Sequence, residues 1–153
     1  MQFIMNNLDE FNDFGIFLSS LLKENDVLVL TGDLGAGKTT LSQSIGKGLG
    51  ICDYISSPTF TILNEYESGR LPLYHFDAYR ITEDDFLFMD FEDYFYRNGV
   101  CLVEWGEIIK NLLPKNSLEL LIKVDDGKRI VEFFGGERKD EIEKVIINEG
   151  SWT

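Results

Sequence analysis

The residues with the clearest potential for chemistry lie in one short, glycine-rich segment. Residues 32–39 read GDLGAGKT and match the pattern GxxxxGK[ST] at every position. In such a loop the glycines let consecutive backbone N–H groups turn towards an anion, and the following helix points its positive dipole end at the same place. Lys38 can reach the β- and γ-phosphates of a nucleotide, and the hydroxyl of Thr39 can bind Mg²⁺. The segment therefore predicts a site for a nucleotide and Mg²⁺.

The surroundings of this loop favour the same interpretation. The apolar run 27–30 is typical of a buried parallel strand, and a helical pattern follows over 38–49. A glycine-rich turn that only joins a strand to a helix is the structural alternative, but the complete match in this context favours nucleotide binding. Eight consecutive residues are expected to contact the nucleotide: Asp33, Leu34, Gly35, Ala36, Gly37, Lys38, Thr39 and Thr40.

Two carboxylates are candidates for a role beside the metal ion. A P-loop enzyme usually needs an acidic residue at the end of a neighbouring strand, opposite the threonine hydroxyl. Asp77 and Glu104 each end a mainly apolar segment, so each would project from the carboxyl edge of the sheet. The alternative is that both only solvate strand ends. Spacing leaves open which of the two binds Mg²⁺ and which orients the attacking water.

Other residues near these segments have two interpretations each. His75 is expected to be packed or hydrogen-bonded rather than catalytic, and Arg80 could contact a phosphate or form a surface ion pair. The segment 57–61 (SPTFT) lies where nucleotide switches often occur, and is otherwise a turn before a β-prone run. The aromatic residues of 86–96 are expected to pack in the core rather than form a docking face, with the acidic residues between them solvated.

The elements that would position these residues follow an α/β order. We expect further helices over 8–23 and from about residues 82, 91, 107 and 138, and further strands near 60–66, 71–77, 100–105, 118–124 and 129–134. Thr82 and Asp85 resemble a capping box, and the sequence DDG at 125–127 is typical of a hairpin turn. The pattern predicts a three-layer P-loop fold over residues 1–153 as one domain, with a mostly parallel sheet and an antiparallel C-terminal strand pair.

The composition limits the classes of partner and compartment. A share of 44% hydrophobic residues is ordinary for a globular domain, whereas the formal net charge of −13 opposes unaided binding to nucleic acid. No apolar run is long enough for a membrane span, and residues 1–5 lack the features of a signal peptide, which predicts a cytoplasmic protein. Cys52 and Cys101 lack metal-binding spacing and are expected to be reduced and buried.

Four motifs together resemble those of the bacterial TsaE (YjeE) family. They are GDLGAGKTT at 32–40, SPTFT at 57–61, HFDAYR at 75–80 and VEW at 103–105. The resemblance implies a small P-loop ATPase that supports tRNA threonylcarbamoyladenosine synthesis. Its partners would be the threonylcarbamoyl transferase subunit and that enzyme's inactive paralogue, with tRNA contacted only through the complex. One departure is visible: Asp90 stands where a glycine is expected.

The resemblance also implies a role for individual residues. Lys38 and Thr39 would bind phosphate and Mg²⁺, and Glu104 would be the second magnesium contact. Asp77 would assist hydrolysis. Thr61 or its neighbours would sense the γ-phosphate, and Trp105 would lie close to the nucleotide.

Rival functions are separated by features of the sequence. A GTPase should carry NKxD and DxxG, and neither pattern occurs. A small-molecule kinase would share the P-loop but commonly closes an arginine-bearing lid over the phosphates, and this chain has five arginines spread along its length. The third possibility is an interaction module that binds ATP without hydrolysing it.

Overall fold

A mixed β-sheet organises the chain, for which the computed structural model describes residues 1–33, 35–149 and 152. Within these residues the sheet has seven strands, in the order β1 (Gln2–Met5), β7 (Lys128–Phe134), β6 (Leu118–Asp125), β2 (Val27–Gly32), β5 (Val100–Glu104), β4 (Leu73–Asp77) and β3 (Leu63–Tyr66). The central strands β6, β2, β5 and β4 are parallel. The outer pairs β6–β7, β1–β7 and β3–β4 are antiparallel. The predicted α/β fold, with its parallel centre and C-terminal strand pair, is confirmed.

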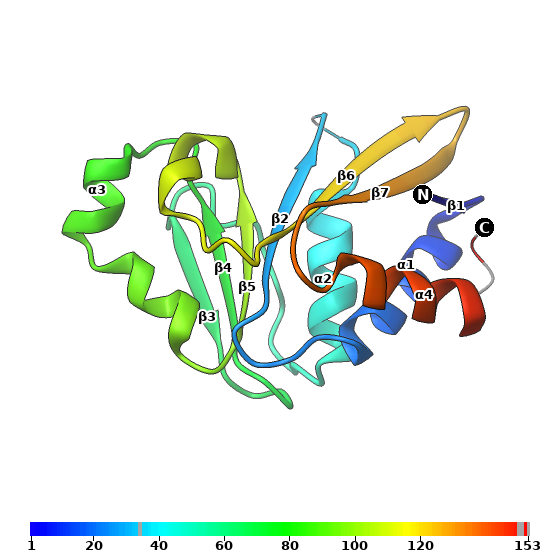
Figure 1. Ribbon diagram of the computed structural model, residues 1–153, viewed down its shortest axis with the longest axis horizontal. Helices are drawn as coiled ribbons and strands as arrows, with labels where there is room; N and C mark the ends of the chain where they lie inside the picture. The colour runs from blue at the N-terminus through cyan, green and yellow to red at the C-terminus, as the bar shows by residue number, and fades with distance from the viewer. Residues whose placement is uncertain (34, 150–151, 153) are drawn as a thin grey trace.

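Helices cover both faces of this sheet. The α-helices are α1 (Leu8–Ser20), α2 (Lys38–Gly48), α3 (Glu83–Phe88) and α4 (Lys139–Glu149), and the 3₁₀-helices are η1 (Phe91–Tyr96) and η2 (Gly106–Leu112). Figure 1 shows α1 and α4 at the end of the molecule that holds both termini, and α3 at the opposite end. None of the helices among the described residues has the length and apolarity needed to cross a membrane.

The core is divided by the sheet into two apolar clusters. Alternate strand residues point to opposite faces, so Leu28 and Leu30 of β2 join the cluster under α1, α2 and α4, while Val27 and Val29 join the cluster under α3, η1 and η2. All four side chains are buried, as expected of a central parallel strand. Because apolar clusters pack on both faces of β2, they hold in place the end of this strand, where the glycine-rich loop begins.

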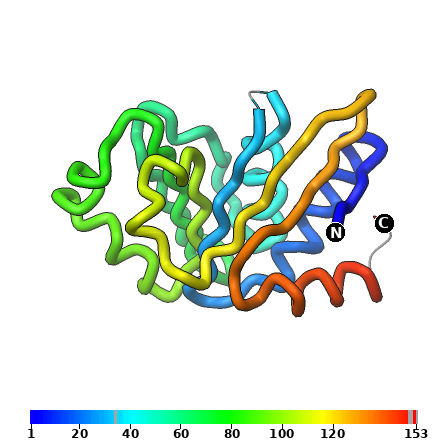
Figure 2. The backbone as a smooth tube through the Cα atoms, turned by 45° about the horizontal axis from the view of Figure 1, so that its top comes forward, coloured from blue at the N-terminus to red at the C-terminus, as the bar shows by residue number. Residues whose placement is uncertain are grey.

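The turn chemistry agrees with the sequence at two places. Thr82 and Asp85 form the predicted capping box at the start of α3, each side chain accepting a hydrogen bond from the other residue's backbone N–H. Asp126 and Gly127, with φ angles of 51° and 78°, form the left-handed turn between β6 and β7. This hairpin and the loop after β2 lie at the same edge of the sheet, the edge at which the parallel strands β2 and β6 end (Figure 2).

Two sequence-based predictions need correction, and one strand was not predicted. The strand expected near 60–66 begins only at Leu63, because residues 60–62 form a turn in which Ile62 has a φ of 68°. Strand β1 was not predicted, since four residues at a sheet edge give a weak pattern. Cys52 was expected to be buried but is exposed, whereas Cys101 is buried as expected.

Candidate nucleotide-binding site

A cleft of about 860 Å³ lies at the carboxyl edge of β2, β4 and β5, above the start of α2. Most of the residues predicted from the sequence line it: Asp33, Gly35, Gly37, Lys38, Thr39, Thr40, Asp77, Glu104 and Trp105. Ala36 is buried beneath the loop and does not line the cleft. Leu34 lies outside the described residues. The cleft therefore brings together residues from segments that are far apart in the sequence, from Asp33 to Trp105, as expected at the carboxyl edge of a parallel sheet.

The loop itself has a conformation that requires glycine. Gly35 and Gly37 have φ angles of 83° and 108°, in the region that side-chain-bearing residues rarely adopt. A Cβ atom on Gly37 would also lie 2.8 Å from Cε2 of Phe11, which is buried in the core beneath. Helix α2 begins after Gly37 without a side-chain cap, so the first N–H groups of the helix are left to bind an anion.

Lys38 lies beside an aromatic pair at the edge of the cleft. Its Nζ atom is 5.2 Å from the centroid of the Trp105 ring, and this ring is 4.8 Å from that of Tyr79. Trp105 follows Glu104 at the end of β5 and has a φ of 60°, a conformation that costs a non-glycine residue about 1–2 kcal/mol. Such strain is typical of binding sites, where the fold holds a side chain in one position.

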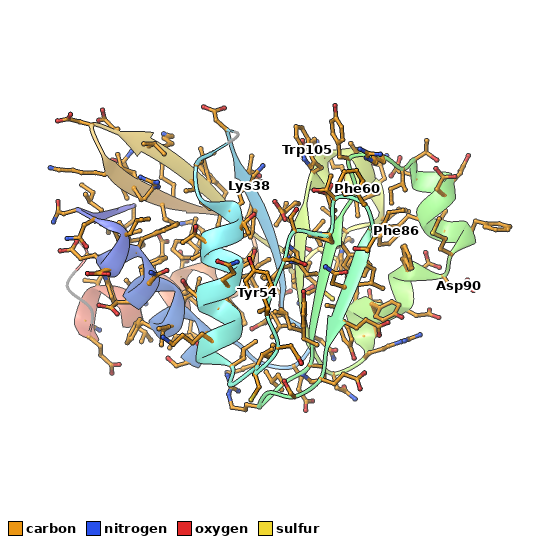
Figure 3. The ribbon with its side chains drawn as sticks, turned by 180° about the vertical axis from the view of Figure 1, so that it is seen from behind. Lys38, Tyr54, Phe60, Phe86, Asp90 and Trp105 are labelled. Atoms are coloured by element: carbon orange, nitrogen blue, oxygen red, sulfur yellow. The ribbon has the colours of Figure 1, made fainter. Side chains whose placement is uncertain are left out.

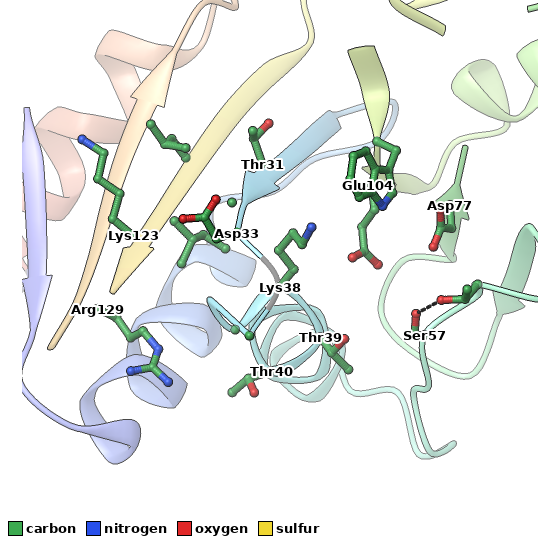
Figure 4. A pocket seen from close by; sticks show the side chains of 17 residues that line it. Thr31, Asp33, Lys38, Thr39, Thr40, Ser57, Asp77, Glu104, Lys123 and Arg129 are labelled. Atoms are coloured by element: carbon green, nitrogen blue, oxygen red, sulfur yellow. Dashed lines mark hydrogen bonds between the residues drawn. The ribbon is translucent and has the colours of Figure 1, made fainter. Parts of the chain in front are cut away.

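The two candidate carboxylates are neighbours in the sheet. Asp77 of β4 and Glu104 of β5 are paired in the parallel register, so both end at the same edge. Each is only 5% exposed. Figure 4 shows both side chains on the side of Lys38 that faces Ser57. Oδ1 of Asp77 accepts a hydrogen bond of 2.9 Å from the backbone N–H of Tyr79, which fixes the start of the following loop.

His75 is hydrogen-bonded rather than exposed to the cleft, as predicted. Its Nε2 atom lies 2.8 Å from Oε2 of Glu104, and the ring is fully buried. Nδ1 has no hydrogen-bond partner in the part of the chain that the structure describes. The contact gives His75 a role in holding Glu104.

Two residues of the switch-like segment line the cleft, whereas Arg80 packs against this segment and does not line the cleft. Ser57 and Thr59 line the cleft and their hydroxyls lie 2.8 Å apart, whereas Thr61 donates to Oδ1 of Asn64 at 2.7 Å and does not line it. Arg80 forms no ion pair with the described residues: its guanidinium lies 4.7 Å from the centroid of the exposed Phe60 ring, and its contact with a phosphate stays a prediction. Figure 3 shows Phe60, Lys38 and Trp105 towards the upper side of the molecule.

The aromatic residues of 86–96 are divided between core and surface. Phe86 and Phe95 are buried, as expected, and Phe76 packs against both rings. Phe88 and Tyr96 are 88% and 68% exposed, so the prediction that the whole group packs inside is wrong for these two. Asp90, between α3 and η1, has a φ of 57°, which explains why a glycine would suit this position.

The donor set fits a magnesium ion that is bound mainly through a nucleotide. No group of three or more His, Cys, Asp or Glu side chains within the described ranges could hold a metal by itself. Mg²⁺ commonly uses one or two protein oxygens together with phosphate oxygens and water. The hydroxyl of Thr39 and the carboxylate of Glu104, which line the same cleft, match this requirement.

Sequence reasoning missed the far wall of the cleft. Leu121, Ile122 and Lys123 of β6 and Arg129 of β7 line it. These residues belong to no motif, and only the pairing of β6 with β2 brings them to the loop. A net charge of −13 makes Lys123 and Arg129 notable, since with Lys38 they gather positive charge in one cleft.

The comparisons with known proteins agree with one another. The family model described as threonylcarbamoyl adenosine biosynthesis protein TsaE matches residues 5–131. The tRNA threonylcarbamoyladenosine biosynthesis protein TsaE of Bacillus subtilis (strain 168) is 44% identical over 128 residues, covering 83% of this chain and 80% of that protein. The protein of the same name from Nostoc sp. is 42% identical, with coverage of 78% and 76%. The crystal structure of Bacillus subtilis YdiB matches with a TM-score of 0.81 and 37% identity, covering 97% of this chain and 94% of that one.

Proposed function

The chain belongs to the TsaE family, and from that premise we propose that it binds and hydrolyses Mg–ATP in support of tRNA threonylcarbamoyladenosine biosynthesis. One observation carries the proposal: the P-loop lysine and threonine share a cleft with two buried strand-end carboxylates. Phosphoryl transfer needs little covalent chemistry from a protein, so positioning and charge are the main contributions that such a site must supply.

Each residue of the cleft has a defined task in this proposal. The backbone N–H groups of the loop and the Lys38 ammonium group bind the β- and γ-phosphates. Thr39 and Glu104 hold Mg²⁺, which neutralises charge on the phosphate oxygens when bound. Asp77 orients the attacking water, and its place beside Glu104 at the strand ends supports a shared role of the two carboxylates at one edge of the sheet.

The proposed partners are the threonylcarbamoyl transferase subunit and its inactive paralogue, with tRNA contacted only through their complex. The net charge of −13 supports an indirect contact, because it repels the phosphate backbone of RNA. The exposed side chains of Trp105, which lines the cleft, and of Phe60, which follows the cleft residue Thr59, would let a bound protein sense the nucleotide.

Steady-state phosphate release separates this function from its rivals. The expected result is Mg²⁺-dependent release from ATP that increases when both partners are added. Nucleotide binding without release, even in the complex, would instead indicate a non-hydrolysing module. Phosphate transfer to a small-molecule acceptor would indicate a kinase, although Arg129, the one arginine that lines the cleft among the described residues, lies on a sheet strand rather than on a lid.

A further inference from the structure

The two walls of the cleft differ in chemistry. On one side of Lys38 lie the carboxylates Asp77 and Glu104, and on the other side lie Lys123 and Arg129 from the β6–β7 hairpin (Figure 4). A triphosphate whose terminal phosphate faces Lys38 and the magnesium-binding carboxylate must direct its nucleoside end away from them. The hairpin wall is therefore positioned to contact the nucleoside end.

Of the two basic side chains in this wall, that of Arg129 is the one that lacks a hydrogen-bond partner among the described residues. Its Nε atom is buried and has no hydrogen-bond partner among residues 1–33, 35–149 and 152. The side chain also makes no ion pair there, even with Asp33, which lines the same wall. An unpaired buried donor destabilises the folded state, whereas an anion that accepts from it would offset that cost.

The other basic residue of the wall does not share this property. Nζ of Lys123 donates to Oε1 of Glu132 at 2.6 Å, so its charge is already paired within the sheet. Arg138, which lies outside the cleft, also has a buried Nε without a hydrogen-bond partner among the described residues, but its guanidinium is paired with Asp26. Arg129 is thus a partly buried guanidinium that faces the cleft without a carboxylate partner in the described chain.

The position of the Arg129 side chain favours contact with one of the three phosphates. The Nε atom lies 3.5 Å from the point where a Cβ on Gly37 would stand, directly against the loop. Thr40, the residue after the magnesium-binding threonine, lines the cleft on the same side as Arg129 (Figure 4). On this side of the loop, the Arg129 guanidinium and the Thr40 side chain would contact the phosphate next to the ribose rather than the terminal phosphate.

We propose that Arg129 binds the α-phosphate of the nucleotide and so fixes the nucleoside end against the β6–β7 hairpin. The proposal rests on the proposed function, since it requires an adenine nucleotide in the cleft. It assigns Arg129 to binding and orientation, not to the transfer of the γ-phosphate. ATP and ADP both carry an α-phosphate, so both should depend on Arg129 to the same extent.

Calorimetric titration of the whole protein with Mg–ATP and with Mg–ADP tests this assignment. Arg129→Ala and the bulkier Arg129→Gln should each raise the Kd for both nucleotides by about tenfold or more, as expected for the loss of a charge-assisted hydrogen bond. Lys128→Ala is the matched control, because Lys128 is the exposed preceding residue of β7 and does not line the cleft. This variant should bind within about twofold of the unchanged protein. Binding by both Arg129 variants at the level of Lys128→Ala would overturn the proposal.

The pattern of lost ATP and ADP affinity shows which proposal an unexpected result would contradict. A loss of ATP affinity without a loss of ADP affinity would place Arg129 at the γ-phosphate and overturn the assignment. Absence of nucleotide binding by the unchanged protein would instead contradict the proposed function. Saturation with ATP should restore phosphate release by the Arg129 variants to within a few-fold of the normal kcat, because only KM depends on this contact.

A second measurement uses the unchanged protein and so does not depend on the folding of variants. Phenylglyoxal modifies accessible arginines, and mass spectrometry locates the modified residues. Mg–ADP should protect Arg129 and leave Arg97, which is exposed and contacts Tyr94 away from the cleft, equally reactive. Equal modification of Arg129 with and without saturating Mg–ADP would overturn the proposal.

Discussion

The Nε2 atom of His75 lies 2.8 Å from the Oε2 atom of Glu104, and both side chains are buried between β4 and β5. A carboxylate at the end of a strand could adopt several rotamers, and this contact restricts Glu104 to one that faces the cleft (Figure 4). His75 is therefore a positioning residue for the proposed magnesium site, because it holds Glu104, the group that would contact the ion.

Replacing His75 with leucine should weaken the magnesium site. Removal of such a supporting contact typically costs about tenfold to a hundredfold in metal affinity or activity, so the Mg²⁺ concentration for half-maximal phosphate release should rise by at least about tenfold. The double variant His75→Leu/Glu104→Gln should be no worse than Glu104→Gln alone, because the two residues act through one contact. Fully additive losses in these magnesium titrations would show that His75 has a separate role.

The two strand-end carboxylates should differ in their response to magnesium. Glu104→Gln should shift the magnesium titration of nucleotide binding to higher concentrations, whereas Asp77→Asn should lower phosphate release with a much smaller shift. Asp125→Asn is the control, since Asp125 also ends a strand but is exposed and lies outside the cleft. A normal titration for Glu104→Gln, with a shifted one for Asp77→Asn, would exchange the two roles.

Much of the site could be predicted because its motifs are local. The conformation of the loop depends on Gly35 and Gly37, and the apolar run before it predicts the buried strand that ends at this loop. Asp77 and Glu104 were found because each ends an apolar run, and parallel strands end at one edge.

The features of the fold and the site that were not predicted depend on contacts between distant segments, which no local sequence pattern indicates. Arg129 reaches the cleft only because β7 pairs with β6 and β6 pairs with β2. Strand β1 exists because Phe3 and Met5 bury their side chains beside β7, while Gln2 and Ile4 face outwards. Thr61 or its neighbours were expected to sense the γ-phosphate, and this stays a prediction: the turn before β3 directs the hydroxyl of Thr61 to Asn64, whereas Thr59 lines the cleft.

The two cysteines should react at very different rates in the folded protein. Cys52 is exposed, whereas burial raises the pKa of the Cys101 thiol to about 12, so almost no thiolate is present at neutral pH. A thiol-reactive disulfide reagent should therefore label one thiol per chain quickly, and the second only after unfolding. Cys52→Ser should remove the fast phase. Two equal, fast phases in the native protein would contradict the burial of Cys101.

Replacing Asp90 with glycine should stabilise the protein. Asp90 has a φ of 57°, and a left-handed conformation costs a side-chain-bearing residue about 1–2 kcal/mol, partly offset by the greater unfolded-state entropy of glycine. The free energy of unfolding in urea should rise by about 0.5 kcal/mol. Asp93→Gly removes the same charge from the neighbouring η1, where φ is not positive. This change should lower the free energy of unfolding by about 0.5–1 kcal/mol. Equal effects of the two changes would show that Asp90 is not strained.

The most direct test of the nucleotide site is a calorimetric titration of the purified protein with ATP, with and without Mg²⁺, beside Lys38→Ala and Lys47→Ala. Lys47 lies on the same helix but is exposed and outside the cleft, so it controls for the loss of a positive charge. We expect one Mg²⁺-dependent site per chain, an affinity at least about tenfold weaker in Lys38→Ala, and near-normal binding by Lys47→Ala. If the folded protein binds no adenine nucleotide with Mg²⁺, even after addition of the transferase and its paralogue, the cleft is not an ATP site.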